Sequence, residues 1–325
     1  MKLFGGETEL KQSDVFSYMT DSGRSSLRLI LKSGLRGKKY LLPDFLCSAI
    51  IDVFDDLDVK YSLYHINEDL SIDMNSLENK AFDIFYVISY FGQRYKQLNK
   101  FIRSEQYVLE DNVFLPIFGK PLEIKNWIGF NSFRKISPLA DGSLIKSTMP
   151  LNDQFIVKRD TLFSNIKYEA KNFKYNYIYN GEPLERSSLE LFQKGEQMLE
   201  QQKEIFAISQ RSLTFLTDYF AGWERENILR EKNFDILKNV LSTYSIPLEP
   251  EAYSFAACRI HNCSYLKEYL KSKKIYLPRN WVNLQKIPNS LYTEMVLIPV
   301  DSRYTAHDVQ YVADQILRFM RGLAL

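Results

Sequence analysis

The chain has 325 residues, of which 42 are lysine or arginine and 40 are aspartate or glutamate, so its formal net charge is +2. A charge this close to balance does not indicate a nucleic-acid partner, which normally requires a strongly basic surface. Hydrophobic residues make up 45% of the chain and aromatic residues 14%. This composition is enough to bury the cores of a large domain and a smaller one.

The three cysteines, Cys47, Cys258 and Cys263, are too few for a disulfide framework and fit a reducing compartment. Together with His261 they do not form a zinc-binding spacing, so we expect no metal. Residues 1–6 lack the apolar segment of a signal peptide, and no apolar run reaches the roughly 20 residues of a membrane span. We therefore expect a cytoplasmic protein without a membrane partner.

The first half of the chain alternates short β-rich runs with helical patterns. Strands that alternate with helices predict a mostly parallel sheet covered on both faces. In such sheets, ligands bind at the carboxyl ends of the strands. The predicted helices are 22–32, 50–54 and 97–104, and the predicted strands are 39–42, 59–66, 84–90, 107–109, 127–131 and 143–146.

The second half is expected to contain more helix. Residues 153–183 are polar, aromatic and weakly periodic, which predicts loops, whereas apolar spacing predicts a long helix over 187–219 and another over 229–244. A small α+β domain is predicted from residue 246 onward. We therefore expect a large domain over 1–245 and a small C-terminal domain over 246–325, the latter with strands 254–258 and 295–299 and helices 263–271 and 305–320.

Two side chains at predicted strand ends indicate a specific chemistry. Asp111 follows the strand at 107–109, and Lys135 follows the strand at 127–131, three residues after Ser132. A lysine that forms a Schiff base and an aspartate that holds a protonated pyridine are the side chains that pyridoxal phosphate chemistry most needs. Because both follow strands of one predicted sheet, we expect them to lie close together and to form a pyridoxal phosphate site.

Several short segments, taken in order, resemble motifs of one enzyme family. They are Ser22-Gly23-Arg24-Ser25-Ser26-Leu27, Leu42-Pro43-Asp44-Phe45, Asp69-Leu70-Ser71-Ile72-Asp73, Ser89-Tyr90-Phe91-Gly92-Gln93, Glu110-Asp111, the segment around Lys135, Ile275-Tyr276-Leu277-Pro278 with Trp281, and Leu297-Ile298-Pro299-Val300-Asp301. In order and spacing the chain resembles a divergent member of the DegT/DnrJ/EryC1/StrS family of pyridoxal phosphate (PLP)-dependent sugar aminotransferases. No single motif is specific; the resemblance rests on their order over most of the chain.

The resemblance implies the fold type I architecture of PLP-dependent transferases. That fold is α/β, with a mostly parallel sheet of the seven-stranded type, helices on both faces, and a small α+β domain at the C-terminus. It also implies a homodimer, because fold type I enzymes generally build each active site from two subunits. The implied substrates are small molecules, a nucleotide sugar and an amino donor such as glutamate.

The resemblance also assigns roles to individual residues. Lys135 would be the catalytic lysine that binds pyridoxal 5'-phosphate as a Schiff base and moves the proton during transfer. Asp111 would be catalytic and cofactor-binding, paired with the protonated pyridine nitrogen. The helix that opens at Gly23 would bind the phosphate with its N–H groups. The remaining implied cofactor-binding side chains are Arg24, Ser25 and Ser132.

The chain departs from the family pattern at several positions. Cys47 stands where the family has an aromatic residue that stacks on the cofactor, Phe114 where it has a glutamine, and Ser89 where it has a histidine. The Gly-Glu-Gly-Gly turn is replaced by Ala140-Asp141-Gly142-Ser143. The Gly-x-Asn-x-Arg segment, which reaches across the dimer in the family, has its nearest counterpart at Tyr179-Asn180-Gly181, without a matching arginine.

Three functional hypotheses remain open from the sequence. The favoured hypothesis is an aminotransferase that acts on a nucleotide-linked keto sugar in surface polysaccharide (O-antigen or capsule) biosynthesis, because Lys135 and Asp111 are both retained. A second is a catalytically degenerate relative that serves as a binding or assembly protein, in line with the departures. A third is another pyridoxal phosphate reaction, such as dehydration or aldol cleavage, since one fold supports several chemistries.

Overall fold

The computed structural model describes residues 14–158, 161–284 and 287–323. The first six residues, on which the expectation about a signal peptide rests, lie outside these ranges. Within the described ranges, no helix has both the length and the apolar character that a membrane crossing requires.

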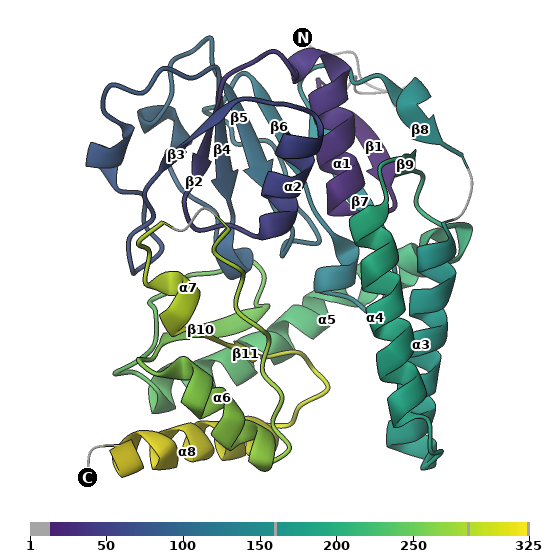
Figure 1. Cartoon of the computed structure of the whole chain (residues 1–325), viewed down its shortest axis with the longest axis vertical. Helices are drawn as coiled ribbons and strands as arrows, with labels where there is room; N and C mark the ends of the chain where they lie inside the picture. Colours follow the sequence, from purple (N-terminus) through teal and green to yellow (C-terminus); the bar gives the residue numbers. More distant parts are fainter. Residues whose placement is uncertain (1–13, 159–160, 285–286, 324–325) are drawn as a thin grey trace, which may run out of the picture.

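A seven-stranded sheet forms the upper half of the molecule in Figure 1, with the order β1-β7-β6-β5-β4-β2-β3. Six strands run parallel, and only β7 is antiparallel to its two neighbours. The predicted seven-stranded, mostly parallel sheet is therefore confirmed. The strands are β1 (Phe16–Thr20), β2 (Tyr40–Pro43), β3 (Tyr61–Tyr64), β4 (Ile84–Ile88), β5 (Tyr107–Asp111), β6 (Trp127–Phe130) and β7 (Ser143–Ser147).

The central strands are buried as expected for a sheet that is covered on both faces. Every residue of β2, β4 and β6 is buried, as expected for strands inside a parallel sheet, whereas the edge strand β3 has an exposed residue. Helices α1 (Gly23–Ile30) and α2 (Ser48–Asp56) lie against one face of this sheet (Figure 1). The strand at Phe16–Thr20 was not predicted from the sequence.

The largest disagreement with the sequence-based prediction lies between residues 153 and 244. The predicted loops over 153–183 are wrong, because α3 (Leu162–Asn180) occupies most of that range. The single long helix over 187–219 is also wrong. The chain instead forms α4 (Glu185–Gln201), the short strand β9 (Ile205–Phe206), which pairs with β8 (Ile156–Val157), and then α5 (Gln210–Val240).

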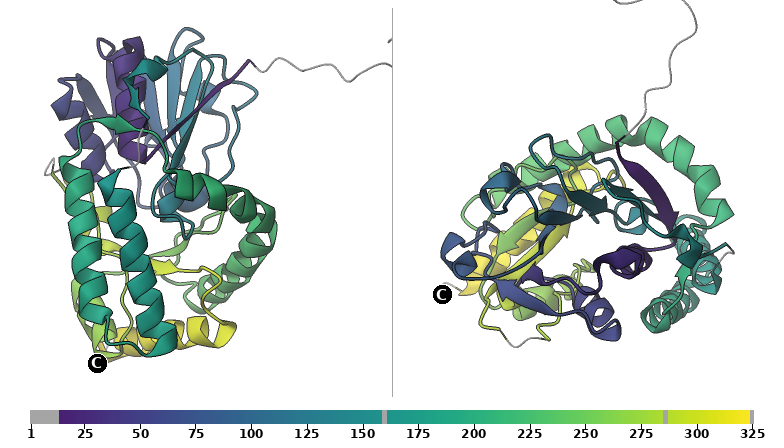
Figure 2. Two further views of the ribbon diagram at one scale, coloured as in Figure 1. Left: turned by 90° about the vertical axis from the view of Figure 1, so that its right-hand side faces the viewer. Right: turned by 90° about the horizontal axis from the view of Figure 1, so that it is seen from above.

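Helices α3 and α4 form an antiparallel hairpin that projects away from the sheet (Figures 1 and 2). Thr161 caps α3 by accepting a hydrogen bond from the Ser164 amide, and Gly181 ends it with a φ of +70°. Apolar periodicity alone misses α3, because this helix packs mainly on α4 and is rich in tyrosine, asparagine and lysine. The helix predicted at 97–104 is likewise wrong and is only a single 3₁₀ turn, Leu98–Lys100.

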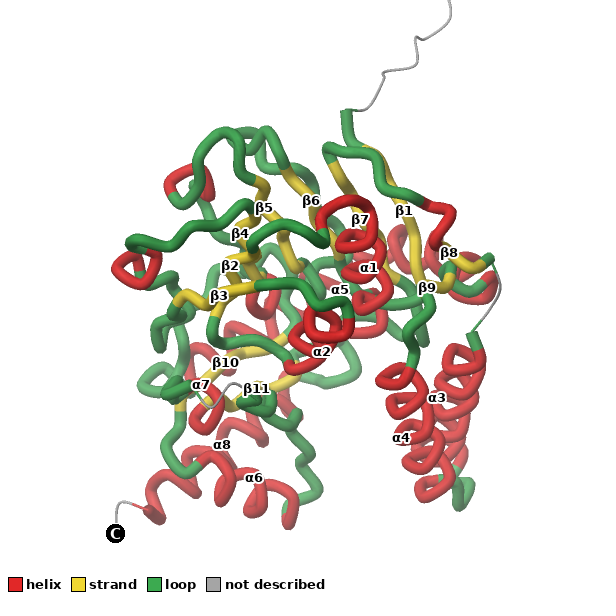
Figure 3. The backbone as a smooth tube through the Cα atoms, turned by 45° about the horizontal axis from the view of Figure 1, so that its top comes forward, coloured by secondary structure: helices red, strands yellow, loops and turns green. Residues whose placement is uncertain are grey.

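The part of the chain that follows α5, called the C-terminal unit below, contains a separate antiparallel sheet below the large one (Figures 1 and 3). Strands β10 (Phe255–Arg259) and β11 (Met295–Pro299) form it, and α6 (Cys263–Ser272), α7 (Leu291–Glu294) and α8 (Ala306–Leu323) accompany them. Helix α8 also contacts α5. The predicted strands and helices of this region are confirmed to within a few residues.

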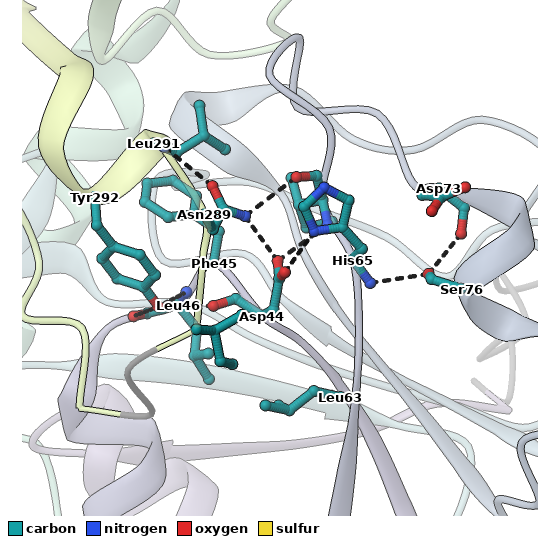
Figure 4. A network of polar contacts seen from close by, with 12 residues as sticks. Asp44, Phe45, Leu46, Leu63, His65, Asp73, Ser76, Asn289, Leu291 and Tyr292 are labelled. Carbon is teal, nitrogen blue, oxygen red and sulfur yellow. Dashed lines mark hydrogen bonds and ion pairs between the residues drawn. The ribbon is translucent and has the colours of Figure 1, made fainter.

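A network of buried polar contacts ties the C-terminal unit to the loop after β2 (Figure 4). The Asp44 carboxylate is 2.6 Å from His65 Nδ1 and accepts hydrogen bonds from the Ile66 amide and the Asn289 side chain, at 3.0 and 2.9 Å. The Tyr292 hydroxyl donates to the Asp44 carbonyl at 2.8 Å and accepts from the Leu46 amide at 3.0 Å. These contacts fix the backbone immediately before Cys47.

The network predicts a measurable cost for removing one hydroxyl. We expect Tyr292→Phe to lower the free energy of unfolding by about 1–3 kcal/mol, because it leaves buried backbone groups of Asp44 and Leu46 without this partner. Urea denaturation would measure the change. Tyr276→Phe is the matched control, since Tyr276 is 70% exposed. Equal free energies of unfolding for the two variants would contradict a stabilising contact between the C-terminal unit and the loop after β2.

Candidate functional site

A cavity lies where the carboxyl ends of the central strands meet the beginning of α1. It is bounded by residues at the ends of β4, β5 and β6, by the first turn of α1, and by residues from more distant parts of the chain. Of the six site residues predicted from the sequence, five line this cavity: Gly23, Arg24, Asp111, Ser132 and Lys135. The fold therefore brings together side chains that are more than 100 positions apart in sequence.

Asp111 ends β5, and its carboxylate is almost completely buried. Tyr86 donates a hydrogen bond to Oδ2 at 2.8 Å, and the Val113 amide donates to Oδ1 at 3.2 Å. Burial raises the pKa of Asp111 to about 6, and the two hydrogen bonds and Lys135 act against that rise. At neutral pH the group is thus mainly an oriented carboxylate at the cavity wall.

Lys135 lies on the short 3₁₀ turn Phe133–Lys135 that follows β6. The positive charge of Arg134, followed by loss of solvent, lowers the pKa of Lys135. Arg134 itself pairs with Glu196 of α4, with an N–O distance of 2.9 Å. The lowered pKa increases the fraction of neutral amine, which is the nucleophilic form.

The turn that carries Lys135 is fixed by the segment after it. Phe133 donates its amide to the Gly142 carbonyl at 2.9 Å, and Gly142 donates to the Asp21 carbonyl at 2.6 Å. Gly142 has a φ of +110°, and a Cβ there would be 2.6 Å from a methyl group of Ile208. Only glycine fits this position without distortion.

The part of the cavity wall at the start of α1 suits an anion. Ser22 caps α1 by accepting the Ser25 amide at 3.2 Å, and the N–H groups of the first turn have no partner within the helix. Arg24 contributes a buried Nη1 atom that has no hydrogen-bond partner among the described residues. A buried, unpartnered guanidinium nitrogen beside a helix N-terminus indicates that this end is built for an anionic group.

Ser25, the sixth predicted residue, is not on the cavity wall. Its hydroxyl accepts hydrogen bonds from Ser22 Oγ at 3.2 Å and from Gln202 Nε2 at 3.3 Å. Ser25 therefore helps to orient Ser22, the residue that caps α1. The sequence pattern placed it correctly on the first turn of α1 but could not show which way its side chain points.

The residues that depart from the family pattern fall into two groups. Cys47 and Phe114 both line the cavity, and Phe114 packs on Phe91 at a centroid distance of 5.6 Å. Ser89 is buried and donates to Asn112 Oδ1 at 2.6 Å. Asp141 accepts hydrogen bonds from the amide and hydroxyl of Ser209, at 2.7 and 2.8 Å, and thus stabilises the start of α5.

Trp281 is a cavity residue to which the sequence analysis gave no role in the site. It comes from the loop before α7 and lines the same cavity as Cys47. Its ring packs on Phe45 with centroids 4.8 Å apart, and Phe45 in turn stacks on Tyr90 at 5.6 Å. The C-terminal unit thus supplies an aromatic ring to the cavity in which Cys47 offers none. The Tyr-x-Pro…Trp pattern was its only signal in the sequence.

The residues present fit pyridoxal phosphate. The phosphate matches the first turn of α1 and the unpartnered Arg24 nitrogen, the ring nitrogen matches the Asp111 carboxylate, and the aldehyde matches Lys135. Ser132 lines the cavity between the end of β6 and the lysine turn and adds a further hydroxyl. The donor set is therefore complementary to the cofactor at three separate points.

No family model matches the chain, and no curated protein sequence matches it. Solved structures, however, resemble it over most of its length. DesV from S. venezuelae has a TM-score of 0.65 at 13% identity, covering 93% of this chain and 84% of that chain. Helicobacter pylori PseC, an aminotransferase involved in the biosynthesis of pseudoaminic acid, has a TM-score of 0.63 at 12% identity, covering 93% and 86%.

A DegT DnrJ EryC1 StrS aminotransferase from Brucella abortus has a TM-score of 0.63 at 14% identity, covering 93% of this chain and 85% of that chain. At these identities the similarity establishes the fold, and the activity must be argued from the site. The chain thus has the α/β fold of the PLP-dependent sugar aminotransferases, as its sequence motifs predicted.

A buried acid beside α1 predicts a pH dependence of stability. Asp21 is fully buried and accepts from Gln202 Nε2 at 2.8 Å, and burial raises its pKa to about 7 from 3.8. Its stabilising contribution is complete below pH 4 and is lost as the pH rises through 7, because the unfolded chain releases this proton more easily.

We therefore expect the free energy of unfolding of the unaltered protein, minus that of Asp21→Asn at the same pH, to fall by about 2–3 kcal/mol between pH 5 and pH 8. Urea denaturation at several pH values would measure this difference, with Asp52→Asn on α2 as the control. A difference that does not change with pH would show that Asp21 does not titrate in this range.

Proposed function

We propose that the protein is a PLP-dependent aminotransferase. The observation that carries this proposal is the single cavity in which Lys135, the Asp111 carboxylate and the anion-binding start of α1 face one ligand volume. Either residue alone would be an ordinary buried or turn residue. Their convergence, together with the unpartnered Arg24 nitrogen, supports a cofactor with an anionic end, a basic ring nitrogen and an aldehyde.

The side chains support defined roles in transfer. When bound, pyridoxal phosphate supplies the electron sink that makes a proton on the carbon next to the nitrogen acidic. Asp111, oriented by Tyr86 and Val113, would hold a proton on the ring nitrogen. Lys135 would hold the aldehyde end of the cofactor, and its amine would accept and return the transferred proton. Trp281 and Phe114 contribute aromatic surface to the cavity wall.

The substrate that we propose is a nucleotide-linked keto sugar, with an amino donor such as glutamate. Support comes from the sequence motifs and from the fold shared with Spr1654 from Streptococcus pneumoniae, which is described as a sugar aminotransferase, and with PseC, an aminotransferase involved in the biosynthesis of pseudoaminic acid. Surface polysaccharide biosynthesis, a homodimer, and a division into domains 1–245 and 246–325 belong to the same proposal.

A second candidate function is a binding or assembly protein derived from this fold. It is favoured by Cys47 and Phe114, which face the cavity where relatives have an aromatic residue and a glutamine. Trp281 on the same cavity favours the enzyme, because it offers a ring surface that Cys47 lacks. Covalent attachment of the cofactor separates the two candidates.

We expect borohydride reduction in the presence of pyridoxal phosphate to attach the cofactor at Lys135, located by peptide mass spectrometry. Lys135→Ala should lose this label and all transaminase activity, because Lys135 is the only lysine among the described residues that line the cavity. Lys194→Ala, an exposed lysine on α4, is the control and should be labelled like the unaltered protein. A lack of label at saturating cofactor would refute the enzyme proposal.

Asp111→Asn tests the ring-nitrogen partner separately. We expect it to keep the label at Lys135 but to lower the transfer rate by about 10²–10³, since a neutral amide stabilises developing charge far less than a carboxylate. Single-turnover kinetics on the cofactor-loaded protein would measure the rate. A rate within a few-fold of the unaltered protein would exclude this role for Asp111.

A further inference from the structure

A second and larger cavity adjoins the cofactor site. Its volume is about 800 Å³, within the range of about 300–1,000 Å³ that is typical of ligand pockets. Arg134 and Lys135 line both cavities, so the second one begins at the lysine on which transfer is proposed to occur. Most of its remaining wall comes from α3, α5 and the loop after β11, where the hairpin faces the C-terminal unit.

The wall of this outer cavity is basic. Six of its residues are lysine or arginine and three are aspartate or glutamate. Two of the three acids are already paired: Glu226 bonds to Arg230 at 2.7 Å, and Asp301 bonds to Arg303 at 2.5 Å. The arrangement therefore leaves uncompensated positive charge in a concave surface, which concentrates anions.

Two lysines of α3 carry this excess. Lys171 and Lys174 are one turn apart and line the cavity, and neither lies within ion-pair distance of a carboxylate in the described part of the chain. Burial and the neighbouring charges of Lys167 and Arg134 lower the pKa of Lys171 to about 8. A half-buried lysine surrounded by cations is unfavourable in the free protein, and a bound anion would relieve that repulsion.

The same wall offers flat apolar surface beside the cations. Tyr175 and Tyr179 lie one turn apart on α3 with ring centroids 4.7 Å apart, and Tyr219 approaches from α5. Tyr175 and Tyr179 are 55% and 64% exposed. Cations interleaved with exposed rings suit a ligand that carries both oxyanions and a ring.

We propose that this outer cavity binds the oxyanionic part of the substrate, a phosphoryl or carboxylate group, through Lys171, Lys174 and Arg303. The inference rests on the proposed function, because it places the remainder of the substrate next to Lys135. The hairpin α3–α4 is then a specificity element, which sets the distance between the anion and the reacting carbon.

Equilibrium binding to the cofactor-loaded full chain tests the inference without requiring turnover. The probes are inorganic pyrophosphate, for a phosphoryl source, and succinate, for a carboxylate source, each titrated by calorimetry. We expect Lys171→Gln and Lys174→Gln each to weaken binding of the preferred probe about tenfold, as for the loss of a hydrogen bond between charged groups. Lys194→Gln on α4 does not line the cavity and should bind like the unaltered protein.

A second measurement reports on Lys171 directly. Acetic anhydride should modify Lys171 readily in the free protein, and the preferred probe should protect it, as followed by peptide mass spectrometry. Binding of neither probe, or equal weakening in Lys194→Gln, would overturn the inference. Cofactor attachment at Lys135 is expected to be the same in Lys171→Gln, so failure here is distinguishable from failure of the proposed function.

Discussion

The site depends on the burial of one carboxylate at the end of a central strand. Placing Asp111 inside the protein costs free energy, and two hydrogen-bond donors and a nearby amine offset part of that cost. Tyr86 donates from the neighbouring strand β4, and Lys135 stands on the turn after β6, the neighbour on the other side. The parallel order of three adjacent strands therefore supplies the acid, its support and its cationic partner at one edge.

The sequence predicted the site correctly where residues of a characteristic chemistry come at the ends of buried strands. The β4, β5 and β6 segments are short and largely apolar, and residues at or just after their ends, Asp111 and Lys135 among them, must meet at the same edge of a parallel sheet. Sequence could not predict contacts that depend on side-chain direction. Ser25 faces Gln202 and not the cavity, and Trp281 reaches the cavity from a loop nearly 150 positions after Lys135.

The hairpin shows why apolar periodicity failed in the middle of the chain. The buried apolar residues of α3, among them Phe163, Ile166 and Ala170, lie in its first half, and its position also depends on polar contacts that a periodicity test cannot weigh. Lys167 of α3 and Arg134 beside the catalytic lysine candidate both bond to Glu196 of α4, at 2.6 and 2.9 Å. This shared carboxylate links the hairpin to the turn that carries Lys135. A displacement of α3 or α4 would therefore also displace that turn.

The C-terminal half of the chain thus has two connections to the cavity that Lys135 lines. Tyr292 and Asn289 hold the C-terminal unit against the loop that leads to Cys47, and Trp281 of the same unit covers the cavity. The hairpin contacts Arg134 through the carboxylate of Glu196. A substrate whose anion bridges Lys171 on the hairpin and Arg303 after β11 would therefore pull together both supports of the cavity. The protein would then select substrates by size and charge through the fit of the hairpin and the C-terminal unit around Lys135. The central sheet would not need to move.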